Sequence, residues 1–315
     1  MYNPENRRTL SFERDLMTDI VYIDRLTKEK KREKIYGGFF INLLYGTGFF
    51  SYLSSLLFLP LFARLPFFSY LYGWFQKSSL SRSKIRPFIA NYAIDSSEFL
   101  EPIESFRSFN DFFIRKLKSS ARPLAEQAIL PADGRYLVYP DISQIDGFVV
   151  KSKKFQLDTL LQDAQLTQRY QRAGMVIARL CPVDYHRFHF ACDCTPEPGR
   201  LINGPLYSVN PIALKKNINY LSENKRMMTP LKTQEFGQIL YIEVGATYVG
   251  SIVQTHTPNQ SYAKGAEKGY FEFGGSCLIL LFEPNTIRFD QDLIDNSAQF
   301  IETRGLLGQS LGSSI

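Results

Sequence analysis

The sequence contains few of the residues that form disulfide frameworks and metal centres. Among its 315 residues there are four cysteines, three histidines and one tryptophan. Four cysteines do not suggest a disulfide framework in a chain of this length, so we expect a reducing compartment. Residues 1–34 are polar and charged, and we expect no secretory signal peptide. We also find no internal repeat and no glycine-rich nucleotide-binding loop.

Outside the N-terminal region, the sequence lacks surplus positive charge. Residues 1–86 hold 14 Lys and Arg against 7 Asp and Glu, whereas residues 87–315 hold 23 against 24. The basic surplus predicts an anionic partner for the N-terminal region, which we expect to be a membrane surface and not a nucleic acid. The mixed Lys and Glu residues of segment 28–34 favour a solvated helix.

An uncharged run extends from Tyr36 to Ala63, and a second apolar stretch, Leu65–Phe75, contains the single tryptophan. The length of the run would permit a transmembrane helix. Glycine, serine and proline residues interrupt it, however, and its aromatic residues do not form two belts. We therefore predict one or two helices in the membrane interface at the cytoplasmic face, as a peripheral or monotopic anchor. A spanning helix and a buried position in the core are the alternatives.

The remaining sequence is typical of a β-rich domain. From about residue 129, short apolar runs alternate with Gly, Pro and Asp. We predict an α+β fold with mixed and antiparallel sheets, preceded by an apolar N-terminal helical membrane-docking region. The predicted boundaries are 1–86 for the membrane-associating region, 87–304 for the β-rich domain and 305–315 for a flexible tail. The predicted strands are Tyr136–Tyr139, Gly147–Lys151, Met175–Leu180, Arg187–Phe190, Ile239–Val244, Tyr248–Val253, Tyr270–Phe273 and Leu278–Phe282.

Two adjacent glycines, Gly274 and Gly275, separate the last two predicted strands and are followed by Ser276. A glycine pair inside a strand pattern indicates a bulge or a close approach of the backbone. It also leaves the carbonyl of Gly275 open to the hydroxyl of Ser276, which could attack it with the help of a base. An ordinary bulge between two core strands would have the same sequence.

Two of the three histidines, His186 and His189, lie three residues apart. In an extended segment this spacing places the two rings on opposite faces, so we expect them to have different roles. Cys192 and Cys194 follow closely and could complete a zinc site. Zinc sites usually separate two ligand pairs by a longer loop, so we predict no metal. The sequence around Asp133, Asp-Gly before a strand, is most often a turn.

Taken together, these segments resemble the phosphatidylserine decarboxylases, a family of proenzymes that cut their own chain. The resemblance covers roughly residues 105–290, beginning with the phenylalanine-rich stretch Ser105–Leu117. Three positions depart from the family pattern: Tyr248, Lys268 and Cys277. The other segments that carry the resemblance are Pro131-Ala132-Asp133-Gly134, Asp184-Tyr185-His186-Arg187-Phe188-His189, Tyr207-Ser208-Val209-Asn210-Pro211, Glu243–Ile252, Lys264–Gly269 and Gly274-Gly275-Ser276.

The resemblance implies cleavage between Gly275 and Ser276, which would yield chains 1–275 and 276–315 and convert Ser276 into a covalent pyruvoyl group. It also implies that His189 is the base of the cleavage relay and that Asp133 orients this base. His186 would lie near the substrate as a candidate proton donor. The two chains would stay together as a heterodimer, which could dimerise further.

The implied reaction converts phosphatidylserine to phosphatidylethanolamine and carbon dioxide at the membrane, with the pyruvoyl carbonyl as the electron sink. Ser208 and Asn210 are candidates for the headgroup pocket. Two alternatives stay open: a pyruvoyl decarboxylase of a soluble amino acid, and a non-enzymatic membrane-bound β domain. The apolar N-terminal region argues against the first alternative. The presence of Asp133, His189 and Ser276 argues against the second.

Overall fold

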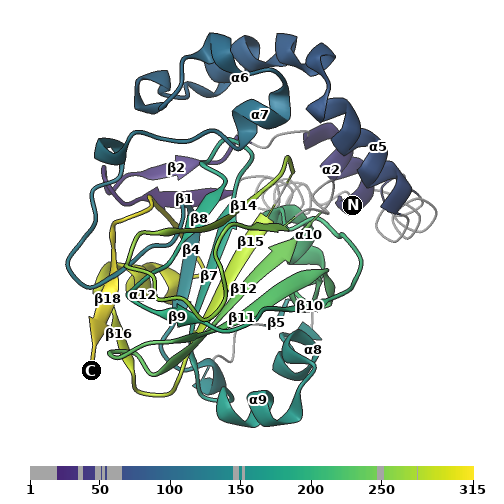
Figure 1. Cartoon of the computed structure of the whole chain (residues 1–315). Helices are drawn as coiled ribbons and strands as arrows, with labels where there is room; N and C mark the ends of the chain where they lie inside the picture. Colours follow the sequence, from purple (N-terminus) through teal and green to yellow (C-terminus); the bar gives the residue numbers. More distant parts are fainter. Residues whose placement is uncertain are drawn as a thin grey trace, which may run out of the picture.

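A ten-stranded sheet runs through the centre of the molecule (Figure 1). The computed structural model describes residues 20–34, 38–46, 51, 54, 66–144, 149–150, 153–246, 252–274 and 276–315. The strand order is β10-β11-β12-β15-β7-β4-β17-β1-β2, and β9 pairs with β11. The bounds are β1 (Val21–Asp24), β2 (Lys30–Arg32), β4 (Gly134–Tyr139), β7 (Gly174–Leu180), β9 (Thr195–Pro196), β10 (Arg200–Ile202), β11 (Arg226–Lys232), β12 (Gln238–Gly245), β15 (Ser276–Phe282) and β17 (Glu302–Gly305).

The middle strands of this sheet, β7, β12 and β15, are buried on both faces. In β15 the even-numbered residues 278–282 pack into one apolar cluster and the odd-numbered residues 277–281 pack into another. A strand covered on both faces needs a continuous apolar run instead of alternation. The predicted strand Leu278–Phe282 is therefore confirmed, and so are the predicted strands in β4, β7 and β12.

Three smaller sheets accompany the large one. The sheet formed by β13, β14 and β8 lies on one face, where Phe188 and Phe271 pack against Tyr241 and Leu280. Among the described residues, β1 and β17 are the parallel pair and the other paired strands are antiparallel. The bounds of the remaining strands are β3 (Ala128–Ile129), β5 (Val149–Val150), β6 (Lys153–Lys154), β8 (Arg187–His189), β13 (Ile252–Gln254), β14 (Glu267–Phe271), β16 (Ile287–Phe289) and β18 (Ser310–Ser314).

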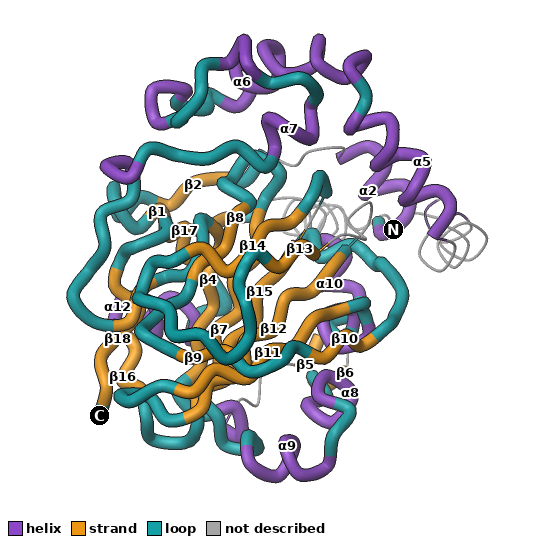
Figure 2. Tube along the Cα trace, viewed as in Figure 1, coloured by secondary structure: helices purple, strands orange, loops and turns teal. Residues whose placement is uncertain are grey.

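The helices gather mainly at two ends of the molecule, with α5, α6 and α7 at one end and α8 and α9 at the other (Figure 2). Leu160 of α8 and Leu221 of α11 belong to the apolar cluster on the face of the large sheet opposite β8. The bounds of the helices are α2 (Gly38–Tyr45), α5 (Pro66–Lys77), α6 (Ile85–Tyr92), α7 (Phe109–Phe113), α8 (Leu157–Leu161), α9 (Ala164–Arg169), α10 (Pro211–Lys216), α11 (Tyr220–Glu223) and α12 (Gln291–Ala298).

The phenylalanine-rich stretch Ser105–Leu117 contains the short helix α7. Its N-cap is Ser108, whose side chain accepts a hydrogen bond from the backbone amide of Asp111 at 3.1 Å. Phe112 and Phe113 are fully buried in a cluster of phenylalanines that also includes Phe273. This cluster therefore anchors the residue three positions before Ser276.

The segment 28–34 is not the predicted helix. Lys30–Arg32 forms β2, which pairs antiparallel with β1, and β1 in turn pairs with β17 of the large sheet. The boundary at residue 86 is therefore also wrong, because residues 20–33 belong to the β-rich domain. Ion pairs of Asp24, Arg25 and Glu33 with residues far away in the sequence stabilise this segment, and a local pattern of Lys and Glu cannot reveal them.

The C-terminal segment 305–315 is not a flexible tail. Its residues 310–314 form β18, which pairs with both β16 and β3, and Leu311 is fully buried. The glycine content that suggested a loose tail has a packing reason. A Cβ at Gly312 would lie 2.3 Å from the carbonyl oxygen of Arg288, so glycine permits the close approach of the two strands.

The uncharged run Tyr36–Ala63 lies largely outside the described residues. In the described parts of the chain, no helix is long and apolar enough to cross a bilayer. Helix α5 carries Leu71 and Trp74 on its exposed side, with 50% and 61% of these residues accessible to solvent. The interfacial anchor stays a prediction.

Candidate active site

Ser276 opens β15 in the middle of the large sheet. It is paired with Gly245 of β12 on one side and with Leu180 of β7 on the other. The residue is completely buried, and its Oγ has no hydrogen-bond partner among the described residues. A buried hydroxyl without a partner is costly, which marks this position for a role other than packing. Gly275 lies outside the described residues.

The backbone before Ser276 adopts an unusual conformation. Gly274 has φ of +142°, which residues with a side chain rarely adopt. Phe273 is attached to α7, because its amide donates a hydrogen bond to Oδ1 of Asn110 at 2.9 Å. Glu272 forms an ion pair with Lys77 of α5 at 2.7 Å. The segment preceding Ser276 is therefore attached to α5 and α7.

His189 ends β8 and is nearly buried, with 8% of its surface exposed. Its backbone amide donates to the carbonyl of Pro131 at 2.8 Å, which brings it beside the segment that carries Asp133. Nδ1 has no partner among the described residues. Burial lowers the pKa of His189 to about 4, against the opposing effect of the negative charges of Glu267 and Asp133. The ring is therefore neutral at pH 7.

His186 precedes β8 and is completely buried, with its ring 3.8 Å from that of Phe113. Nδ1 lies 2.9 Å from the carbonyl oxygen of Asp184. A carbonyl can only accept, so Nδ1 carries the proton and Nε2 carries the lone pair. Burial, with a smaller contribution from the positive charge of Arg115, lowers the pKa of His186 to about 3. The buried Nε2 has no partner among the described residues.

Asp133 is buried immediately before β4. Arg122 donates to both of its carboxylate oxygens, at 2.9 and 2.7 Å, and the amide of Leu307 donates to Oδ1 at 2.8 Å. Arg122 is shared with Glu98, at 2.9 and 3.0 Å. Asp133 is thus more than a turn residue, because it joins the N-terminal half of the domain to the C-terminal segment.

Sequence reasoning did not single out Arg115, which is a buried cation near His186. Its hydrogen bonds within the described chain go to carbonyl oxygens, among them those of Val183 and Asp184 at 3.5 Å, and its Nε has no partner there. It lies over the rings of Phe99 and Phe112. Burial lowers the pKa of Arg115 to about 10, so it is charged at pH 7.

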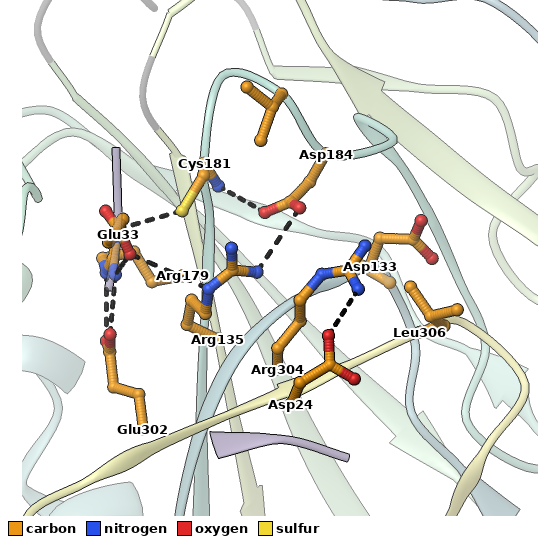
Figure 3. Close-up of polar contacts among 12 residues, drawn as sticks. Asp24, Glu33, Asp133, Arg135, Arg179, Cys181, Asp184, Glu302, Arg304 and Leu306 are labelled. Atoms are coloured by element: carbon orange, nitrogen blue, oxygen red, sulfur yellow. Dashed lines mark hydrogen bonds and ion pairs between the residues drawn. The ribbon is translucent and has the colours of Figure 1, made fainter. Parts of the chain in front are cut away.

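A buried ion-pair network lies beside the loop that carries His186 (Figure 3). Arg179 pairs with both Glu33 and Glu302 at 2.6 Å. Arg135 lies 3.5 Å from Asp184, whose other carboxylate oxygen accepts a hydrogen bond from the amide of Cys181 at 2.8 Å. The network therefore connects the N-terminal segment and β17 to the start of the histidine loop.

Ser208 and Asn210 lie in the segment before α10. The hydroxyl of Ser208 accepts a hydrogen bond from the amide of Asn210, and Asn210 caps α10 through the amide of Ile212. These contacts explain both residues locally, and their predicted role in headgroup binding stays a prediction. Asn224, which sequence reasoning missed, donates to the carbonyls of Tyr207 and Gly245 at 2.8 Å and so connects this segment to the strand beside Ser276.

The structure brings the predicted residues together only in part. Asp133 and His189 lie on adjoining segments. The backbone carbonyl of His186 accepts a hydrogen bond from the amide of Phe271 in β14, the strand that leads to Ser276. Among the described residues, neither Ser276 Oγ nor His189 Nδ1 forms a hydrogen bond, so no hydrogen-bonded relay joins them there. Within the same residues, no group of three or more His, Cys, Asp and Glu side chains is placed to hold a metal ion.

An α+β fold that buries a serine hydroxyl and two neutral imidazoles is typical of an enzyme that works by acid–base and nucleophilic chemistry. A family model described as phosphatidylserine decarboxylase matches residues 109–312. The chain belongs to this family and is a decarboxylase.

Curated relatives agree over nearly the whole chain. The phosphatidylserine decarboxylase proenzyme of Chlamydia pneumoniae is 53% identical over 296 residues, which cover 93% of this chain and 97% of that protein. The proenzymes of Chlamydia felis and Chlamydia caviae are 49% and 50% identical over 302 residues, covering 95% of this chain and 99% of each relative.

Proposed function

We propose that this decarboxylase cuts its own chain between Gly275 and Ser276 and then converts phosphatidylserine to phosphatidylethanolamine at a membrane surface. The observation that carries the proposal is a set of three buried polar atoms without described partners: Ser276 Oγ, His189 Nδ1 and His186 Nε2. Each of them is one of the atoms that self-processing and decarboxylation require to be free. Family membership and the names of the relatives support the substrate.

Self-cleavage would begin with transfer of the Ser276 hydroxyl proton to His189. The serine oxygen attacks the carbonyl carbon of Gly275, the peptide C–N bond breaks, and the nitrogen of residue 276 takes up a proton. The resulting ester then loses the Cα proton of residue 276 and releases Gly275 as a carboxylate. Addition of water and loss of ammonia leave a carbonyl at residue 276, the pyruvoyl group.

Asp133 would support this step by stabilising protonated His189. A carboxylate has about four acceptor positions. Three are used by Arg122 and the amide of Leu307, which leaves one on Oδ2. The negative charges of Asp133 and Glu267 both favour the protonated form of His189 and oppose its burial. A neutral base that can be stabilised once it is charged suits a proton transfer.

The residues around position 276 fit a pyruvoyl group. When present, this group supplies an electron sink for the carboxylate that leaves the substrate. The neighbouring strands β7 and β12 would hold residue 276 and exclude water. His186 offers a lone pair at Nε2 and no proton, so it would first take a proton from the substrate ammonium. It could then return this proton to the substrate carbon after carbon dioxide has left.

The test is decarboxylation of vesicles that contain phosphatidylserine, with free serine as the comparison substrate. We expect activity on the vesicles, little activity on free serine, and loss of activity after treatment with hydroxylamine. Ser276→Ala should abolish the activity, whereas Ser261→Ala, a change at an exposed serine, should leave it unchanged. Full activity of Ser276→Ala would contradict the proposal.

A further inference from the structure

Residues 20–33 form a short antiparallel hairpin, β1 and β2, with Glu33 at its end; we call this segment the N-terminal clamp. Figure 1 shows it in purple beside the yellow C-terminal part of the chain. In the proposed mature enzyme, this C-terminal part belongs to the separate chain 276–315. The contacts between the two are therefore contacts between chains, and the inference below rests on the proposed self-cleavage for that meaning.

We propose that the N-terminal clamp docks on residues 290–310 of the short chain and holds the Leu307 amide against Asp133. The clamp is a positioning element. Its partner is a specific surface of the short chain, formed by the outer edge of β17 and the start of α12.

Backbone pairing provides the first part of the docking. β1 runs parallel to β17 in the register Tyr22–Glu302, Ile23–Thr303 and Asp24–Arg304. The amide of Arg25 continues the pairing by donating to the carbonyl of Arg304 at 3.0 Å. The clamp thereby covers what would otherwise be an open edge of β17.

Charged side chains provide the second part. Arg25 donates to both carboxylate oxygens of Asp292, at 2.9 and 2.8 Å, and to Asp290 at 2.7 Å. It also donates to the carbonyl of Ser310. Only 10% of the Arg25 side chain is exposed, so solvent screens these contacts weakly. This arginine alone therefore connects the clamp to three separate positions of the short chain.

Three further ion pairs connect the clamp to β17, two of them through Arg179. Asp24 is 3% exposed and accepts a hydrogen bond from Arg304 at 3.0 Å. Glu33 and Glu302 share Arg179, which binds each at 2.6 Å (Figure 3). Although burial opposes the shift, the pKa of Asp24 is lowered by hydrogen bonds that include those from Arg304 and Lys31.

β17, the strand on which the clamp docks, lies directly beside the strand that follows Asp133. β17 pairs on its inner side with β4, in the register Gly305–Gly134, and Asp133 immediately precedes that glycine. Two residues after β17, the amide of Leu307 donates to Asp133 at 2.8 Å. A clamp on the outer edge of β17 thus acts one strand away from the carboxylate proposed to assist His189.

The experiment compares Arg25→Ala and Asp292→Asn, which remove the two sides of one contact, with Arg169→Ala. Arg169 also pairs with a short-chain residue, Glu283 at 2.6 Å, but this pair lies outside the clamp and 47% of the Arg169 side chain is exposed. Hydrogen exchange is measured first in the uncut Ser276→Ala background. Because this readout needs no cleavage, it tests the clamp even if self-processing does not occur.

We expect amides of residues 302–307 to exchange at least tenfold faster in Arg25→Ala and Asp292→Asn, because each variant loses at least one charge-assisted hydrogen bond. Exchange in β15 should stay slow, and Arg169→Ala should behave like the parent. With Ser276 restored, the two clamp variants should form the two chains several-fold more slowly than Arg169→Ala. Unchanged exchange at residues 302–307 in both clamp variants would overturn the inference, and so would normal processing despite faster exchange.

Discussion

Lys268 Nζ lies 2.5 Å from Glu243 Oε1, and both residues are completely buried. Thr229 and Gln254 supply two further acceptors for the lysine, at 3.1 and 2.7 Å. Lys268 belongs to β14 of the small sheet that also holds His189, whereas Glu243 belongs to β12 beside Ser276. The pair is therefore a polar link between the two sheets that carry the candidate active site.

Removing one member of this pair should be costly. Lys268→Met leaves Glu243 as an unpaired buried carboxylate, so we expect a loss of about 3–5 kcal/mol in the free energy of unfolding. The double variant Lys268→Met/Glu243→Gln removes both charges and should recover much of this loss. Urea unfolding of the two variants and the parent measures the difference. Equal stability of the single and double variants would show that the loss in free energy of unfolding does not come from leaving Glu243 unpaired.

The two histidines should separate in their effects. His189→Ala removes the proposed base and should block cleavage, whereas His186→Ala should allow at least some cleavage but lower turnover. Chain formation on a denaturing gel and activity per pyruvoyl group measure the two effects independently. If both variants process as the parent does, the proposed roles are wrong.

Replacement of Asp133 by Asn should slow maturation without abolishing it. The amide cannot stabilise protonated His189, and loss of the equivalent carboxylate in a serine protease costs on the order of 10⁴ in rate. Because each molecule is cut only once, uncut proenzyme should accumulate and mature over hours or longer. A time course of chain formation, with the exposed-site variant Asp158→Asn as control, provides the measurement. Maturation as fast as in the control would leave Asp133 as a structural residue.

Self-cleavage should tolerate mild acid. The pKa of His189 is lowered to about 4 by burial, so the base stays neutral until the pH approaches that value. We expect the cleavage rate to be nearly constant from pH 8 to about pH 5 and to fall by half near pH 4, whereas an unperturbed histidine would lose half its activity near pH 6.5. Half-loss near pH 6.5 in a folded protein would contradict the assignment.

Stability must be followed in the same pH series. The folded pKa of His189 lies below its ordinary value of 6.5, so the unfolded chain binds more protons between about pH 6.5 and pH 4. The free energy of unfolding should therefore decrease as the pH falls through this window. Circular dichroism at each pH separates loss of structure from loss of the base.

Membrane binding can be followed through the single tryptophan. Trp74 is 61% exposed on α5, and its fluorescence should shift to shorter wavelength when it enters an interface. Binding to vesicles should strengthen with anionic lipid and weaken with salt, because the N-terminal region carries the basic surplus. Carbonate extraction should release an interfacial protein. Equal binding to neutral and anionic vesicles at all salt concentrations would contradict the electrostatic part of this prediction.

The central strands could be predicted because their signal is local. Residues 278–282 form a continuous apolar run, and a strand buried on both faces uses such a run in full. β2 and β18 could not be predicted in the same way. Lys30–Arg32 looks like a solvated charge run, and the Gly and Ser residues of 305–315 look like a tail, until their distant partners are known.

The residues of the candidate site also divide into those that the sequence could predict and those that it could not. Asp133, His186, His189 and Ser276 were found because each lies in a recognisable motif. Arg115 and Arg122 were missed because arginine is mostly exposed, and nothing in their immediate sequence indicates burial. Their partners, such as Asp184 and Glu98, come from other segments that only the fold brings together.

The central claim is that the Gly275–Ser276 bond is cut by the protein itself, and intact mass under denaturing conditions tests it most directly. We predict two chains, residues 1–275 and 276–315, with the second lighter by the mass of one ammonia than a chain that starts with serine. Ser276→Ala should give one chain of full length. A parent protein that stays full length, lacks a carbonyl reactive to hydroxylamine and still decarboxylates phosphatidylserine would contradict the account.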